Sequence, residues 1–227
     1  MVCRQTAAIS AIWPIGPVSR HAACTVGGNQ LVMHTFRGVF VKTMTSDGTS
    51  TSWVEQTTAD EGPEGLSMCA MTTLTDTTLL VYGGSTKTQQ LSSDAFVLNT
   101  ESWEWTKLVG DDADHPQARA SPCAVQCGEN QCIIFGGACL GERGYEGGAG
   151  LQAQDDTWLL TVVDGTKAVW ERILMSSDDE SCYPKARLAS SLSKIPSSAS
   201  SFGGAFLLSG GWDPKGGTFD DVWVLTP

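Results

Sequence analysis

The sequence predicts an all-β fold built from repeated four-stranded antiparallel units. Short runs of Val, Leu, Ile, Thr and aromatic residues alternate with clusters of Gly, Asp, Ser and Pro at roughly ten-residue spacing, which indicates many short strands. No segment keeps the 3.6-residue periodicity of an amphipathic helix. Three apolar runs end on two consecutive glycines, so one structural unit recurs along the chain. The runs are LLVYGG (79–84), CIIFGG (132–137) and FLLSGG (206–211).

Each unit is expected to contain the same succession of elements. A Pro-x-x-Arg sequence precedes the first strand, and a hairpin turn leads into the second strand, which ends on Gly-Gly. An Asp-x-aromatic sequence then opens the third strand, and a Trp lies in the fourth. The units cover approximately residues 17–56, 63–108, 116–174 and 184–227 of a single domain that spans residues 1–227.

The four units differ in how completely they keep this order. In the first unit, His34 and Thr35 stand where the other units have Gly-Gly, so it is the most divergent copy. The second and third units are complete and end on SWEWTKL (102–108) and AVWERI (168–173). The fourth unit stops after DVWVL (221–225), its expected third strand, whereas AISAIW (8–13) precedes the first unit as a spare fourth strand.

Four-stranded units with these signatures resemble the kelch repeat of β-propellers, a family that includes the central domain of galactose oxidase. The resemblance covers about residues 8–227 and implies four-stranded antiparallel blades around a central channel, with a period near 50 residues. Either residues 8–13 complete the fourth unit in a closed ring of about four blades, or the chain is an arc of a larger propeller. We favour the arc, whose terminal blade edges further blades or subunits would cover.

The repeated glycines are interpreted as structural. Strands that converge on an axis have little lateral room, and glycine permits positive φ and close backbone approach where the chain turns outward. The pairs are Gly83 and Gly84, Gly136 and Gly137, and Gly210 and Gly211. The aromatic residues of the third and fourth strands are interpreted as wedges between blades. They are Phe96, Trp105, Trp158, Trp170 and Trp223.

Composition limits the classes of partner. The net charge of −11 and the pI near 4.6 disfavour nucleic acid, because the field of the protein repels phosphate. No apolar segment approaches the roughly 20 residues of a membrane helix, so membrane insertion is not expected. Eight scattered cysteines and the absence of an Asn-x-Ser/Thr sequence favour an intracellular, cytoplasmic protein.

Candidate partner-binding residues lie in loops that open on one face of such a blade. Arg20, Arg119 and Arg187 end the Pro-x-x-Arg sequences, and in the resembled family arginines at this place either contact acidic ligands or pair with neighbouring blades. Unit two has Leu66 there instead. The other candidates are Arg143 and Tyr145 in the Gly-rich loop, Trp212 and Lys215 after the last Gly-Gly, and the acidic Asp111, Asp112, Asp178 and Asp179.

The acidic loops offer two interpretations. In the first, they have a role in binding, either by steering a basic segment of a protein partner or by holding a cation weakly. In the second, they are solvated loops of an acidic protein with no role in binding. No Cys-x-x-Cys pair indicates zinc, and the loop 141–150 lacks the Gly-Lys-Ser/Thr ending of a phosphate-binding loop. Cys127 and Cys132 either pair across a hairpin or pack as small apolar groups.

The function expected from these residues is a non-catalytic protein-interaction module that needs no cofactor and no metal. The three Tyr and three His residues are scattered along the chain and form no Tyr/His cluster in the sequence, so no copper site like that of galactose oxidase is indicated. Two alternatives stay open. The chain is a structural subunit that uses its exposed blade edges, or it is a propeller enzyme that acts on sugars.

Overall fold

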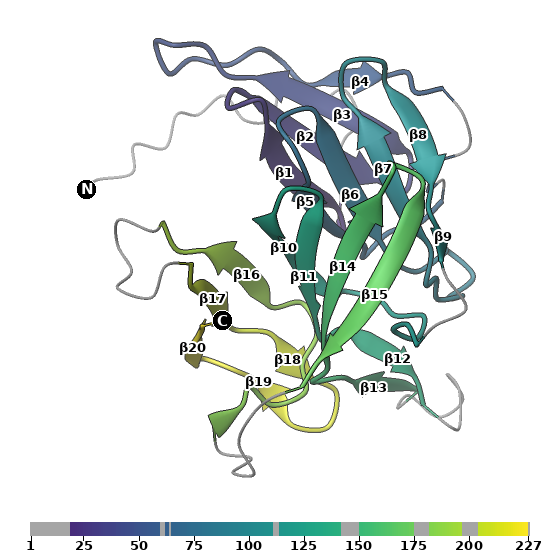
Figure 1. Cartoon of the computed structure of the whole chain (residues 1–227), viewed down its shortest axis with the longest axis vertical. Coiled ribbons are helices and arrows are strands. Elements are labelled where there is room, and N and C mark those ends of the chain that lie inside the picture. Colours follow the sequence, from purple (N-terminus) through teal and green to yellow (C-terminus); the bar gives the residue numbers. More distant parts are fainter. Residues whose placement is uncertain are drawn as a thin grey trace.

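The computed structural model describes residues 19–59, 62–63, 65–110, 114–141, 150–174, 182–196 and 204–226, and these residues are almost entirely β. Four antiparallel sheets are arranged as the blades of a β-propeller (Figure 1), which confirms the predicted fold class. Across the described ranges, no helix has the length and apolar character that a membrane crossing requires. The spare strand expected at residues 8–13 lies outside these ranges.

The strands follow the predicted order in every blade. Blade one contains β1 (Ala22–Val26), β2 (Gln30–Thr35), β3 (Gly38–Thr43) and β4 (Val54–Gln56). Blade two contains β5 (Ala70–Thr73), β6 (Thr78–Tyr82), β7 (Ala95–Asn99) and β8 (Glu104–Lys107). Blade three contains β10 (Cys123–Gly128), β11 (Gln131–Phe135), β14 (Thr157–Val163) and β15 (Lys167–Ile173). Blade four has three described strands, β16 (Ser191–Lys194), β17 (Phe206–Ser209) and β20 (Val222–Leu225).

Five short strands were not expected from the sequence. The strand β9 (Val109–Gly110) belongs to the linker after blade two and pairs in parallel with the outer strand β15 of blade three. The other four form two small hairpins that follow the Gly-Gly pairs of blades three and four. They are β12 (Ala138–Leu140) with β13 (Leu151–Ala153), and β18 (Trp212–Asp213) with β19 (Gly217–Thr218).

The core is divided into layers that lie between successive blades. Val32 and Val41 of blade one pack against Leu79 of blade two, in a cluster that also contains Phe96 and Trp105. The second cluster joins blades two and three, and the third joins blades three and four, with Trp170 and Trp223 packed at their margins. Each layer buries apolar side chains from two sheets, so a single blade cannot cover its own core.

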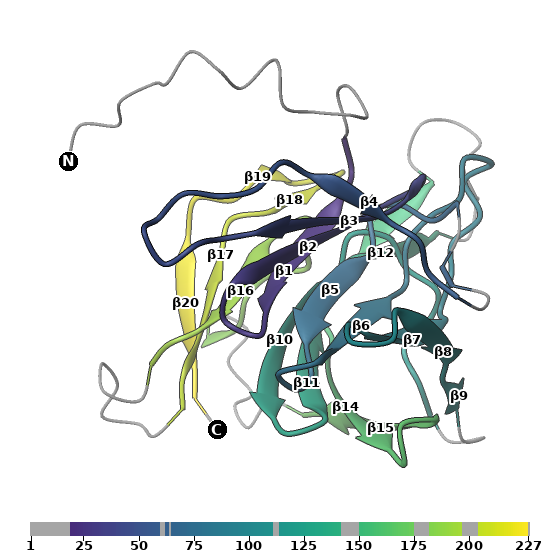
Figure 2. The same ribbon diagram turned by 90° about the horizontal axis from the view of Figure 1, so that it is seen from above.

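A series of backbone hydrogen bonds links the blades around the axis. The residues before the first strands, Arg20, Met68, Ser121 and Ala189, all have left-handed φ values of 60°, 58°, 51° and 55°. The N–H of Met68 donates to the Arg20 carbonyl at 2.9 Å, that of Ser121 to Met68 at 2.7 Å, and that of Ala189 to Ser121 at 2.9 Å. The first strand of each blade is therefore the innermost one (Figure 2), whereas the sequence suggested that the Gly-Gly strand was.

The junction between blades four and one is built differently. Among the described residues, no hydrogen bond joins Ala189 to Arg20 and continues the series. The outer strand β20 of blade four exposes 61% of Val222 and 55% of Val224. In the described part of the chain, the junction between blades four and one thus lacks the main-chain hydrogen bonds that link the other three pairs of neighbouring blades at the axis.

The Gly-Gly pairs lie where one blade meets the next. A Cβ on Gly83 would be 2.8 Å from the Arg119 carbonyl, and a Cβ on Gly136 would be 2.5 Å from the Arg187 carbonyl. The following glycines, Gly84 and Gly137, donate their N–H groups to these same carbonyls. Positive φ and the approach of the next blade therefore both require glycine in blades two and three.

Candidate functional site

A funnel opens at the axis of the propeller on the side of the Gly-Gly loops. It has a volume of about 910 Å³, and all four blades contribute to it. In Figure 2 the inner strands β1, β5, β10 and β16 gather around the axis from which the blades radiate. The described lining residues are Ser19, Arg20, His21, Phe36, Ser67, Met68, Cys69, Ser85, Thr86, Lys87, Gln89, Ser121, Pro122, Leu151, Leu188, Ala189 and Trp212.

The charge of the funnel is opposite to that of the whole protein. Arg20 and Lys87 are exposed basic side chains, and no carboxylate occurs among the described lining residues, although the net charge of the chain is −11. The Lys87 ammonium lies 4.7 Å from the centroid of the Phe36 ring. The funnel can therefore hold an anionic group beside an aromatic surface.

Arg119 and Arg187 lie inside the blades and not at the funnel. Their side chains are 1% and 0% exposed. Arg119 forms a bidentate pair with Asp156, with N–O distances of 2.6 and 2.9 Å, and it also donates to the Gly136 carbonyl at 2.9 Å. Arg187 repeats this arrangement with Asp221. Each of these arginines thus pairs with a carboxylate of its own blade, not with a neighbouring blade, and neither is accessible to a partner.

Arg20 is not the equivalent of these buried arginines. Its left-handed φ and its place in the axial hydrogen-bond series align it with Ser121 and Ala189, two residues after Arg119 and Arg187. The Pro-x-x-Arg sequence of the first unit is therefore out of register with the others. This shift explains why Arg20 is exposed at the funnel whereas the other two arginines are buried.

The remaining candidates divide into two groups. Trp212 is 40% exposed at the funnel, and Lys215 is exposed in the turn between β18 and β19. Arg143, Tyr145, Asp111, Asp112, Asp178 and Asp179 lie outside the described residues. Phe36 and Lys87 carry no sequence signal of their own, because separate loops bring them together at the funnel and no motif contains them.

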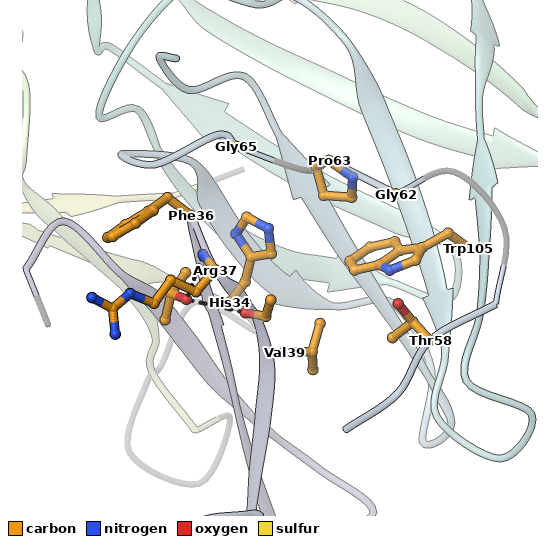
Figure 3. A pocket seen from close by; sticks show the side chains of 11 residues that line it. His34, Phe36, Arg37, Val39, Thr58, Gly62, Pro63, Gly65 and Trp105 are labelled. Carbon is orange, nitrogen blue, oxygen red and sulfur yellow. Dashed lines mark hydrogen bonds between the residues drawn. The ribbon is translucent and has the colours of Figure 1, made fainter. Parts of the chain in front are cut away.

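A second, smaller cavity lies between blades one and two around His34 (Figure 3). Its volume is about 180 Å³, and Trp105, Thr58 and Pro63 are among its walls. His34 is 3% exposed and meets the Trp105 ring edge-on, with 6.2 Å between centroids. Burial lowers the pKa of His34 to about 4, although an interaction with the Pro63 backbone opposes this effect, so the imidazole is neutral near pH 7.

The cavity lies at a position where blade two has a larger residue than blade one. The position in blade two equivalent to His34 is Tyr82 and not a glycine, so the predicted alignment of His34 with Gly83 was wrong by one residue, and Thr35 stands in the place of Gly83. The Tyr82 hydroxyl donates to the Pro116 carbonyl at 3.5 Å, and the Tyr82 ring lies 5.1 Å from that of Trp170. The shorter imidazole leaves the corresponding space between blades one and two unfilled. Packing therefore accounts for this cavity, and the funnel is the stronger candidate site.

The cysteines and histidines do not converge. All described cysteines are free thiols, and Cys69, Cys123, Cys132 and Cys139 are buried. Burial raises the pKa of Cys69 to about 12, so this thiol remains protonated and packs as a small apolar group. Within the ranges that the structure covers, no group of three or more His, Cys, Asp or Glu side chains could hold a metal ion.

These features define a propeller scaffold with a basic and aromatic axial funnel. Two solved structures show the same fold at low sequence identity. "Structure of YjhT" is 18% identical with a TM-score of 0.50, over 82% of this chain and 48% of that one. A chain in "Cryo-EM structure of RAG in complex with one melted RSS and one unmelted RSS" is 14% identical with a TM-score of 0.55, over 86% of this chain and 60% of that one. This chain thus spans roughly half to three fifths of the matched structures.

The family follows from the sequence match. Residues 18–227 match the family described as the KLHDC2/KLHL20/DRC7 Kelch-repeats domain. The chain therefore belongs to the kelch-repeat family, as its repeated Gly-Gly strands and Asp-x-aromatic sequences predicted. Kelch domains generally act as scaffolds for protein interactions.

Proposed function

We propose that this chain is a non-catalytic protein-interaction module that binds a carboxylate-bearing segment of a partner protein in the axial funnel. The observation that carries the proposal is the basic lining of the funnel in an acidic protein. Arg20 and Lys87 offer charged donors, and Phe36 and Trp212 offer aromatic surface next to them. Such a surface complements acidic side chains or a terminal carboxylate.

The shape of the funnel supports a peptide ligand. Its volume of about 910 Å³ is near the upper end of the usual range for small-molecule pockets, which is roughly 300–1,000 Å³. Ser67, Ser85 and Ser121 also line the funnel, and their hydroxyl oxygens can accept hydrogen bonds from the backbone N–H groups of an extended segment. An elongated chain with one or two carboxylates therefore fits both the space and the charge.

Peptide selection followed by a charge-matched comparison tests the proposal. Peptides of random sequence are selected on the purified protein, and their affinities are measured by fluorescence polarisation. We expect acidic peptides, with binding weakened about tenfold or more in the double variant Arg20→Ala/Lys87→Ala. The control variant Lys167→Ala/Lys194→Ala removes the same charge from exposed lysines outside the funnel. Equal losses in the two variants would show that net charge and not the funnel governs binding.

A second candidate function is that of a subunit that buries its terminal blade edges, and β20 favours it. This strand exposes Val222 and Val224 on a blade with three described strands. Analytical ultracentrifugation of the wild type and of Val222→Lys/Val224→Lys distinguishes the two functions. Association that the lysines abolish supports the subunit, whereas a monomer in both cases supports recognition at the funnel.

A further inference from the structure

In blade two, a leucine stands at the position where blades three and four carry a buried arginine. Isolated backbone bridges precede the first strand in blades two, three and four, and they align Leu66 with Arg119 and Arg187. In the two later blades the arginine is 1% or 0% exposed and pairs with a carboxylate. In blade two the same position is a buried leucine, 7% exposed.

The carboxylate that would pair with this arginine is nevertheless present. The N–H of Gly83 donates to the Asp94 carbonyl at 3.0 Å, and the N–H of Gly136 donates to the Asp156 carbonyl at 3.1 Å. These matching bonds place Asp94 and Asp156 at the same point of their blades. Asp94 has lost its inner partner, and its side chain is 44% exposed.

In blade three, a second cation lies on the outer strand of the same blade as the carboxylate that Arg119 binds. Arg119 binds Asp156 from the inner side. On the outer strand, Arg172 faces Trp158, with its guanidinium 5.9 Å from the centroid of the ring, and its positive charge makes a small contribution to lowering the pKa of Asp156. Both cations are therefore compatible with one carboxylate.

Blade two keeps only the outer cation. Lys107 pairs with Phe96 across the strands, as Arg172 pairs with Trp158, and its Nζ lies 2.9 Å from Asp94 Oδ1. No described residue supplies an inner cation to Asp94. The inner side of the Asp94 carboxylate is therefore free to bind another cation.

A cavity leads to this free place. It has a volume of about 430 Å³ and lies against Leu66, Asp94 and Phe96, and we call it the blade-two cavity. Asp94 is the one charged side chain among its described lining residues, so the cavity favours a cation. Ser92 and Ser93 add hydroxyl acceptors, and the Phe96 ring adds an apolar wall.

We propose that the blade-two cavity binds an arginine side chain of a partner protein, in the place that Arg119 occupies in blade three. Arginine suits the site better than lysine, because a planar guanidinium can bond both oxygens of one carboxylate, as Arg119 and Arg187 do. Thr86 lines both this cavity and the funnel, so one partner segment can reach both. The site does not depend on binding in the funnel, and its test is separate.

The probe is Nα-acetyl-L-arginine methylamide, titrated into the ¹⁵N-labelled protein and followed by amide chemical shifts. We expect saturable shifts at Leu66, Asp94 and Phe96, and none with the matching citrulline compound, which has nearly the same shape without the charge. Asp94→Asn should weaken binding about tenfold or more. The control Asp164→Asn removes an exposed carboxylate elsewhere, from a turn with φ of 51° that asparagine tolerates, and should leave binding unchanged.

The variant Leu66→Arg provides a second, independent readout. Its guanidinium should occupy the site from within, pair with Asp94 and abolish binding of the arginine probe. The proposal is overturned if citrulline produces the same shifts, if the arginine probe produces none, or if Asp94→Asn binds the probe as the wild type does. Because Asp94 is half exposed, Asp94→Asn tests the site even if Leu66→Arg does not fold.

Discussion

Replacing Arg119 with methionine should destabilise the protein by roughly 3–5 kcal/mol, because the change leaves the Asp156 carboxylate buried without its partner. Arg119 is 1% exposed and the Asp156 side chain 12%, so solvent screens the pair little. Arg119 also bonds the Gly136 carbonyl at 2.9 Å and the Gln117 carbonyl at 3.0 Å, and both bonds would be lost. With a urea m-value of about 3 kcal/mol/M, the unfolding midpoint should fall by roughly 1–1.7 M.

Urea unfolding monitored by tryptophan fluorescence measures this change. The control is Arg20→Met, which removes the same guanidinium from an exposed position and should change the free energy of unfolding by no more than about 0.5 kcal/mol. The double variant Arg119→Met/Asp156→Ala should recover part of the loss, because it also removes the unpaired charge. A loss for Arg119→Met no larger than that for Arg20→Met would refute the reasoning that burial makes this pair structural.

Three further predictions concern the junctions and the titratable groups. Gly136→Ala should lower the melting temperature more than Gly210→Ala, because φ is similar at both but the nearest atom to an added Cβ is 2.5 Å away at Gly136 and 3.8 Å at Gly210. The hydrogen bond from Arg187 lowers the pKa of Asp221 to about 2, so the stability from this pair is present above pH 4 and lost as the pH falls towards 2. In acid unfolding, Asp221→Asn should make the free energy of unfolding depend less on pH across this range. Burial lowers the pKa of His34 from 6.5 to about 4, so the unfolded chain binds more protons between these values. Stability should therefore decrease as the pH is lowered from 6.5 to 4 in the wild type, and it should decrease less in His34→Phe.

Most of the strands could be predicted because their signals are local. The Gly-Gly endings, the alternating apolar runs and the turns identified all four strands of blades one to three, as well as β16, β17 and β20. The short hairpins β12–β13 and β18–β19 escaped because each has only two or three residues per strand. Such strands carry no periodic signal, and tertiary packing selects them.

The candidate site was predictable only in part. The sequence showed an arginine before the first strand in three units, but one of these arginines is shifted by two residues. Arg20 and Arg119 look alike as Pro-x-x-Arg, yet one is exposed at the funnel and the other is 1% exposed beside Asp156. Asp156 lies 37 residues further along the chain, so no local pattern could show the pair.

The sequence by itself determined the repeat, the all-β class and the family, because each rests on residue patterns within one blade. Only the tertiary structure decided which face of each blade its neighbour covers, and hence which charges are buried. The funnel arises from loops of four separate blades, and the blade-two cavity arises because Leu66 leaves Asp94 without an inner cation. Burial and pairing depend on residues that are distant in sequence and adjacent in space, and this is why the arginine of the same Pro-x-x-Arg motif is buried in two blades and exposed in a third.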